Sequence, residues 1–185
     1  MKLKLLAFLL AICLVILPSC SSDLEALKEE YYTVKIVVKD YGTITARVYP
    51  EIAPKTVETF VGLVNEGFYD GLVFHRVIKD FMIQCGADKD GTHESIKGEF
   101  NDNGFKNDLK HKRGVLSMAR TPSYNSATTQ FFICQRDSAH LDGQYAAFGE
   151  VIDGMDVVDA IAVVDTDASD TPLTPVVIET VYIEE

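Results

Sequence analysis

An arginine lies inside an otherwise apolar run of this sequence, FHRVIKDFMIQCG at residues 74–86. An arginine side chain does not lose its charge in a protein, so a guanidinium in apolar surroundings needs a partner or a function. A fixed cationic donor beside apolar side chains is suited to stabilising charge that develops in a transition state. The alternative for Arg76 is a surface ion pair, since the chain holds an excess of acidic residues.

Amide side chains stand beside aromatic side chains at further places. FMIQ (81–84) and QFFI (130–133) each combine aromatic or thioether side chains with a glutamine, and HLDGQYAAFG adds Leu141, Tyr145 and Phe148. Taken singly, each run predicts a core strand, because an alternating strand has to bury some phenylalanines. Taken together, they are candidates for an apolar binding surface edged by amides.

The motifs of hydrolytic and phosphate-transfer enzymes are absent from the sequence, which has no GxSxG and no P-loop. No carboxylate lies in an apolar run that would raise its pKa, and Ser117 in GVLSMAR has no obvious base. There is no CxxC, and metal-ligand spacing is missing from the four histidines, His75, His93, His111 and His140. Acid–base and nucleophilic chemistry therefore have little support, and no metal or cofactor is expected.

Short strands and two helices have to position these residues. Apolar residues alternate around a DYG turn within 34–48, which predicts a β-hairpin. Spacings of three and four predict a helix over 54–66, with Pro54 in its first turn and Gly67 after its end. Residues 86–113 form a Gly-, Asp- and Asn-rich loop, long enough to be functional or disordered. Short apolar runs separated by turns cover 72–74, 77–84, 114–118, 130–134 and 146–151.

A second helix and a closing strand are predicted near the end of the chain. In DGMDVVDAIAVV, Asp153 is a plausible N-cap, and Met155, Val158 and Ile161 fall on one helix face. TPVVIETVYIEE alternates as a strand near 176–183. Many short strands with two helices and no βαβ rhythm favour an antiparallel barrel or sandwich.

Length and charge bound the class of protein. With 185 residues, of which 47% are hydrophobic, the chain suits one domain with a sizeable core. The net charge of −11 argues against nucleic acid as a partner, because phosphate binding needs clustered Lys and Arg. Nothing in the sequence indicates more than a monomer.

The N-terminal segment has the pattern of a bacterial secretory signal, predicted over 1–19. Lys2 and Lys4 precede an apolar run over 5–17, which is too short to span a bilayer. The run ends in LPSC, which resembles the lipobox of lipoproteins, so we expect cleavage before Cys20 and a lipid on that cysteine. The alternative is an ordinary signal peptide cut nearby.

This interpretation divides the chain into a signal (1–19), a tether (20–32) carrying the lipidated cysteine, and a folded domain (33–185). It predicts a protein of the bacterial cell envelope that faces the periplasm and is anchored by its N-terminal lipid to the inner or the outer membrane. Cys85 and Cys134 remain in apolar runs, either as a disulfide or as two buried thiols, and we favour the thiols.

Several motifs, taken in order along the chain, resemble those of cyclophilin-type peptidyl-prolyl cis-trans isomerases. They are FHRVIKDFMIQCG, IKGEFNDNG, GVLSMAR, SATTQFFIC and LDGQYAAFGEVIDGMDVV, and the resemblance covers about residues 33–183. It implies a mainly β fold, a closed eight-stranded antiparallel β-barrel capped by two α-helices. It also implies an enzyme without a cofactor that rotates X-Pro bonds in proline-containing polypeptides, here those of exported proteins.

The same resemblance implies the residues of the site. Arg76 would be the catalytic donor at the prolyl nitrogen and carbonyl, with Gln84 as a second amide near it. The apolar pocket and the groove beside it would be formed by Phe81, Met82, Gly91, Ala119, Arg120, Thr121, Gln130, Phe132, His140, Leu141 and Tyr145. In one straight strand, Phe81 and Arg76 would point to opposite faces, because they are an odd number of residues apart. We therefore predict a turn at Lys79–Asp80, which brings both side chains to the same face. His75 would point away and be structural.

The chain departs from the family pattern at three positions of this site. His140 stands where many members have tryptophan, Tyr145 where many have histidine, and Arg120 where asparagine is common. Two alternatives to an active isomerase are a proline-peptide binding module or chaperone with little catalysis, and a structural envelope lipoprotein without a ligand.

Overall fold

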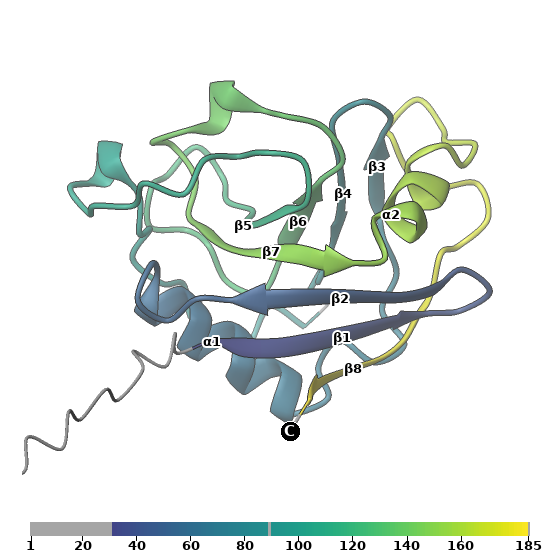
Figure 1. Cartoon of the computed structure of the whole chain (residues 1–185), viewed down its shortest axis with the longest axis horizontal. Helices are drawn as coiled ribbons and strands as arrows, with labels where there is room; N and C mark the ends of the chain where they lie inside the picture. Colours follow the sequence, from purple (N-terminus) through teal and green to yellow (C-terminus); the bar gives the residue numbers. More distant parts are fainter. Residues whose placement is uncertain (1–30, 89, 185) are drawn as a thin grey trace, which may run out of the picture.

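The computed structural model describes residues 31–88 and 90–184. The predicted signal peptide, Cys20 and most of the predicted tether lie outside these residues. Eight antiparallel strands form one curled sheet, and two helices lie at its opposite ends (Figure 1). The strands are β1 (Tyr32–Val38), β2 (Gly42–Val48), β3 (Arg76–Ile78), β4 (Met82–Cys85), β5 (Val115–Met118), β6 (Phe131–Cys134), β7 (Ala147–Asp153) and β8 (Ile178–Glu184). The helices are α1 (Pro54–Asn65) and α2 (Met155–Ala162).

The sequence patterns of the first two elements are confirmed. β1 and β2 pair as the predicted hairpin, from Tyr32 opposite Val48 to Val38 opposite Gly42. α1 has proline at its start and ends beside Gly67, whose φ of +69° suits a residue without a Cβ. Alternation in the strands and the spacing in the helix therefore place their apolar faces on one core.

The sheet is not a fully closed barrel, so the predicted closure is overstated. The strand order is β3-β4-β6-β5-β7-β2-β1-β8, and in the described residues β3 and β8 remain its two edges. A single bridge between Val73 and Val177 and a hydrogen bond from the Phe74 N–H to the Val176 carbonyl (3.0 Å) join the chain across this seam. All three residues of β3 pair with β4, and no ladder joins β3 to β8 in the described residues. The apolar run 72–74 accordingly contributes one bridge and no strand.

The start of α2 differs from the prediction. Asp153 ends β7, and Gly154, with φ of +85°, occupies the N-cap position instead. A Cβ at this glycine would lie 2.3 Å from the Thr43 carbonyl oxygen, so only glycine lets β7 turn directly into the helix. The predicted apolar face holds: Val158 and Ile161 are fully buried, and Met155 packs against the core.

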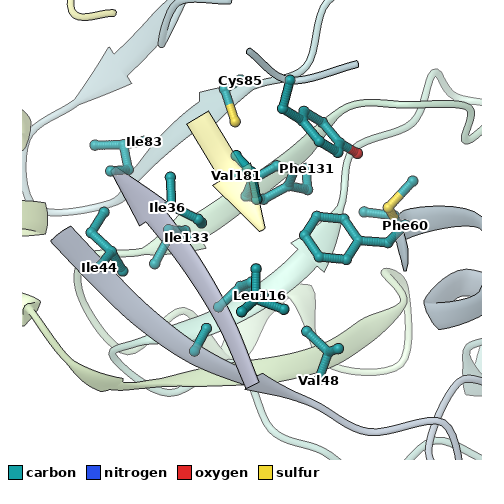
Figure 2. Close-up of a cluster of buried hydrophobic side chains, with 14 of the residues drawn as sticks. Ile36, Ile44, Val48, Phe60, Ile83, Cys85, Leu116, Phe131, Ile133 and Val181 are labelled. Carbon is teal, nitrogen blue, oxygen red and sulfur yellow. The ribbon is translucent and has the colours of Figure 1, made fainter. Parts of the chain in front are cut away.

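The interior of the barrel is filled with side chains. Figure 2 shows Ile36, Ile44, Ile83, Leu116 and Ile133, from five different strands, pointing toward one another. The ring of Phe60 from α1 meets that of Phe131 edge-on, with centroids 5.2 Å apart. Because this interior is packed, a substrate site has to lie on the outer face of the sheet.

Candidate active site

One row of side chains crosses four neighbouring strands on the outer face of the sheet. Arg76 on β3 is opposite Gln84 on β4, Gln84 is opposite Phe132 on β6, and Phe132 is opposite Ser117 on β5. Side chains alternate between the two faces of a strand, so the residues flanking this row, such as Ile83, point into the core. The antiparallel register therefore gathers a cation, an amide and an aromatic ring on one face.

The turn that separates β3 from β4 falls at Lys79–Asp80, as predicted. Asp80 has a left-handed backbone with φ of +62°, and the Phe81 N–H donates to the Ile78 carbonyl (3.1 Å). The turn returns the chain so that Phe81 lies on the same side as Met82 and Arg76. FHRVIKDFMIQCG is therefore a hairpin with one core face and one outer face.

A cavity of about 400 Å³ lies over this row, and its floor is apolar. Met82, Phe132 and Leu141 are 2%, 5% and 6% exposed and form a hydrophobic cluster with Cys134, separate from the barrel core. The cavity is lined by Arg76, Phe81, Met82, Gln84, Ala119, Arg120, Phe132, His140, Leu141 and Tyr145, all of them predicted site residues. The geometry brings these residues together, and their roles stay predictions.

Arg76 stands at the edge of this cavity and also forms an ion pair. Its Nε donates to Asp170 Oδ2 over 3.3 Å, and its side chain is 44% exposed. Within the described part of the chain, its two terminal nitrogens have no hydrogen-bond partner. The sequence left two interpretations of Arg76 open, a surface ion pair or a cationic donor beside apolar side chains. The guanidinium combines both, with an ion pair on one edge and a free donor edge beside an apolar cavity.

A smaller cavity of about 200 Å³ adjoins the first and shares Gln84, Ala119 and Arg120 with it. The predicted residues Thr121 and Gln130 line this second cavity, and Gln84 Nε2 donates to Gln130 Oε1 over 2.8 Å. Ser126 and Thr128 also line it and were missed in the sequence. Thr128 lies two residues before Gln130, and residues two apart on an extended chain share a face. That spacing could have identified Thr128 as a neighbour of Gln130 in the site.

Arg120 is held rigidly between the two cavities. Its guanidinium carbon lies 4.4 Å from the ring centroid of Tyr145 and 5.0 Å from that of Tyr124. Its Nε donates to the Gln144 carbonyl over 3.0 Å. These contacts are side-chain contacts, so this residue adds a cationic wall that an asparagine would not supply.

Gly91 lines none of the cavities described here. The Gly91 N–H donates to Asp88 Oδ1 over 3.0 Å, and Oδ2 of the same carboxylate accepts a hydrogen bond from the ring Nδ1 of His93 over 2.8 Å. The hydrogen bond from His93 is the main reason why the pKa of Asp88 lies well below its ordinary value. The loop over 86–113 is therefore ordered in part by side-chain hydrogen bonds to its own backbone.

Ser117 has a partner that the sequence did not reveal. His111 Nε2 lies 3.0 Å from Ser117 Oγ, and its Nδ1 lies 3.0 Å from Asp142 Oδ1. The arrangement has the order of a Ser-His-Asp triad, but Ser117 and His111 are 0% and 2% exposed, so no substrate reaches the hydroxyl. The His111 ring stacks on Phe132 with centroids 6.2 Å apart, which makes this chain of hydrogen bonds a support for the cavity floor.

We expect the stability of the domain to fall as the pH falls through the ordinary range of histidine. Burial is the main cause that lowers the pKa of His111, and burial also lowers the pKa of His75. A folded-state pKa below the unfolded value of about 6.5 means that the unfolded state binds protons first, so stability is lost as the pH drops below about 6.5. Thermal unfolding followed by circular dichroism between about pH 7.5 and pH 5 measures this slope.

A variant set separates His111 from the other groups that titrate. His111→Gln is expected to lower the melting temperature at neutral pH and to flatten its dependence on pH. His75→Gln removes the other histidine whose pKa burial lowers, and it is expected to keep the part of the slope that comes from His111. Equal slopes for the wild type and His111→Gln would contradict the assignment.

Cys85 and Cys134 are both buried and unpaired, which confirms the interpretation as free thiols. Cys85 belongs to the barrel core, whereas Cys134 lies under the cavity floor on the opposite face. Burial raises the pKa of Cys134 to about 12, so its thiol stays protonated and unreactive near neutral pH.

A hollow of about 520 Å³ elsewhere on the surface is larger but has a different character. It is lined by Arg113, Gln135, Arg136, Asp137 and Asp159. Arg113 donates to both Asp159 oxygens over 2.7 Å, and this bond is the main reason why the pKa of Asp159 falls to about 2. The charged side chains that line this hollow have partners within the protein, and no apolar side chain is among its lining residues.

Two further properties concern only residues 31–88 and 90–184. No three His, Cys, Asp or Glu side chains there are grouped in a way that would hold a metal ion. No helix of this part has the length and hydropathy needed to cross a membrane.

Comparison with known proteins places this geometry in a family. The family described as Cyclophilin type peptidyl-prolyl cis-trans isomerase/CLD matches residues 33–183. Peptidyl-prolyl cis-trans isomerase B of Escherichia coli is 42% identical, over 79% of this chain and 96% of its own length. Peptidyl-prolyl cis-trans isomerase cyp18 of Streptomyces antibioticus is 44% identical, over 77% and 93%.

Solved structures agree in fold. A cyclophilin type peptidyl-prolyl cis-trans isomerase of Cryptosporidium parvum superposes with a TM-score of 0.76 at 29% identity, covering 84% of this chain and 99% of its own. A second structure of that protein, in the presence of the dipeptide Ala-Pro, gives a TM-score of 0.74 at 30% identity, covering 83% and 99%. The chain belongs to the family of cyclophilin-type peptidyl-prolyl cis-trans isomerases.

Proposed function

We propose that this isomerase accelerates rotation of X-Pro bonds with Arg76 as the donor that stabilises the transition state above an apolar proline pocket. The observation that carries the proposal is the row Arg76–Gln84–Phe132, in which a guanidinium with free terminal nitrogens borders a cavity whose floor is apolar. We further propose that its substrates are proline-containing segments of exported proteins.

Rotation of an X-Pro bond makes and breaks no covalent bond, so the enzyme has only to position the substrate and to stabilise the charge of the transition state. Rotation about the peptide bond breaks its resonance, and the uncatalysed barrier is about 20 kcal/mol. At the transition state the prolyl nitrogen becomes pyramidal and its lone pair can accept a hydrogen bond. A donor that meets this lone pair binds the twisted state more tightly than the planar ones, which is the condition for acceleration. The terminal nitrogens of Arg76 fulfil it.

The cavity fits a proline ring and leaves room for the residues before it. Phe132, Met82 and Leu141 offer apolar contact to the ring, and the adjoining polar cavity near Gln130 suits the preceding side chains. The Ala-Pro dipeptide used with the Cryptosporidium protein is the same chemical class of ligand. A proline-containing polypeptide is therefore the substrate we propose.

Measuring cis–trans exchange in a short proline peptide by NMR tests the activity directly. We expect the full-length protein at about micromolar concentration to bring exchange well below the uncatalysed time of tens of seconds at 25 °C. Chemical-shift changes without faster exchange would instead favour the binding module or chaperone. The absence of both would favour a structural lipoprotein.

The proposed place of action is the bacterial cell envelope, facing the periplasm, with a lipid on Cys20 holding the protein at a membrane. The support is the basic start, the short apolar run and LPSC at the N-terminus, which lie outside the described residues. Mass spectrometry of the mature N-terminus decides it: an acylated Cys20 supports the anchor, and an unmodified residue nearby contradicts it.

A further inference from the structure

The partner of Arg76 comes from a distant part of the chain. Asp170, 94 residues further along, lies in the segment between α2 and β8, and its Oδ2 accepts the Nε–H of Arg76 over 3.3 Å. Both side chains are partly exposed, at 44% and 42%. An ion pair exposed to this degree adds little to folding stability, so its main effect is on where the guanidinium lies.

The segment that carries Asp170 is fixed by its own hydrogen bonds. Asp167 Oδ1 accepts the N–H groups of Ser169 (2.8 Å) and Thr171 (2.9 Å), which closes a tight turn around Asp170. The Asp170 carbonyl in turn accepts the N–H of Val77 over 2.8 Å, next to Arg76 on β3. The carboxylate is therefore presented to Arg76 from a turn that is itself bonded to the same strand.

The backbone of Asp170 has φ of +64°, in the left-handed region. Aspartate, asparagine and glycine tolerate this conformation better than other residues do. A side chain in this conformation leaves the turn toward β3, where it meets Arg76. Backbone conformation and hydrogen bonding thus agree on one position for the carboxylate.

The pairing divides the guanidinium into two edges. Arginine has five N–H donors in one rigid plane, and the bond at Nε fixes the orientation of that plane. The four donors on the terminal nitrogens are left without partners in residues 31–88 and 90–184, and Arg76 borders the cavity. The side chain of an arginine with no partner would be mobile, and fixing it in the transition state of every turnover would cost conformational entropy.

We propose that Asp170 is the positioning residue of this isomerase: it holds Arg76 by its Nε edge so that the terminal nitrogens face the proline cavity. The proposal rests on the proposed role of Arg76 as the transition-state donor. Asp170 itself touches no substrate and acts only through the guanidinium.

Two substitutions that suit a left-handed backbone test the proposal. Asp170→Gly removes the carboxylate without straining the turn, and we expect kcat to fall about tenfold while KM changes by less than about twofold. Asp170→Asn keeps an oxygen that can accept from Nε, and we expect kcat within about threefold of the wild type. This rescue by asparagine separates positioning from a general need for the native turn.

Asp40→Gly is the matched control. Asp40 has nearly the same backbone, with φ of +65°, but lies in the β1–β2 turn, and its side chain makes no hydrogen bond or ion pair in the described structure. We expect it to leave kcat and KM unchanged. The Nε–Hε NMR signal of Arg76 is a readout independent of activity: it should shift in Asp170→Gly and stay near its wild-type position in Asp170→Asn.

Three results would overturn the proposal: wild-type kcat in Asp170→Gly, an equal loss in Asp170→Asn and Asp170→Gly, or faster catalysis in Asp170→Gly, which would mean that the pair holds Arg76 back. Assaying Arg76→Ala in parallel keeps the two proposals apart. If Arg76→Ala loses activity and Asp170→Gly does not, only the positioning role fails. If Arg76→Ala keeps full activity, the proposed mechanism itself fails.

Discussion

Replacing Arg76 by alanine is expected to lower kcat/KM for a proline peptide by about 10²- to 10³-fold, the effect of removing one preorganised transition-state donor. Stability should change little, because the side chain is partly exposed and its ion pair with Asp170 is a surface one. We expect a melting temperature within about 3 °C of the wild type. Peptide titration by NMR should still show binding, since the apolar floor around Phe132 is intact.

Two further variants make the Arg76 result specific. Arg136→Ala removes another exposed arginine, whose Nε pairs with Asp80 over 2.7 Å beside the same hairpin but outside the proline cavity. We expect it to keep wild-type activity. Arg76→Lys keeps the charge and loses the planar set of donors, so it should recover only part of the loss. Full activity in Arg76→Ala, or an equal loss in Arg136→Ala, would contradict the proposed mechanism.

Replacing Phe132 by leucine is expected to raise KM for the same peptide by about tenfold or more. Phe132 is 5% exposed, forms the centre of the cavity floor and meets Tyr145 edge-on, with ring centroids 6.0 Å apart. Leucine keeps the position apolar but removes the flat surface on which a proline ring would pack. A change of this size in a packed site costs about 1–2 kcal/mol of folding free energy, so the protein should stay folded.

The neighbouring Phe131 supplies the matched control. It lies one residue earlier on β6, is fully buried and points into the barrel core, where its ring contacts those of Phe60 and Tyr69. Phe131→Leu should lower the melting temperature at least as much as Phe132→Leu but leave KM unchanged. Steady-state kinetics and thermal unfolding of both variants measure the two effects, and a KM rise shared by both would show that general loosening is responsible.

Much of the fold was predictable because its signals are local. The alternation around DYG predicted the β1–β2 hairpin, and the three- and four-residue spacing predicted α1. The turn at Lys79–Asp80 was predicted once the resemblance had assigned Phe81 to the same site as Arg76. Each of these depends on residues within about ten positions of one another, where side-chain periodicity decides structure. The N-cap of α2 was wrong because the close approach of Gly154 to Thr43 joins elements far apart in the sequence.

Most of the candidate site was also predictable, through family resemblance more than through periodicity. Periodicity alone could not have separated Phe132 and Met82 from core residues, because FFIC is apolar throughout and MIQC is apolar except for Gln84. Gly91 was expected on the rim of the groove, and the structure places it in a loop whose amide binds Asp88, away from the cavities described.

The sequence by itself determined most of the strands and both helices, because periodicity and turn chemistry act over short stretches of chain, and the resemblance of its motifs supplied the residues of the site. Only the tertiary structure decided how those stretches face one another. The register of β3, β4, β6 and β5 put Arg76 and Phe132 in one row, and the open seam brought Asp170 to the guanidinium. Arg76 lies 56 positions from Phe132 and 94 positions from Asp170 in the sequence, so their proximity follows from strand pairing and from the way the sheet curls, which no local pattern encodes.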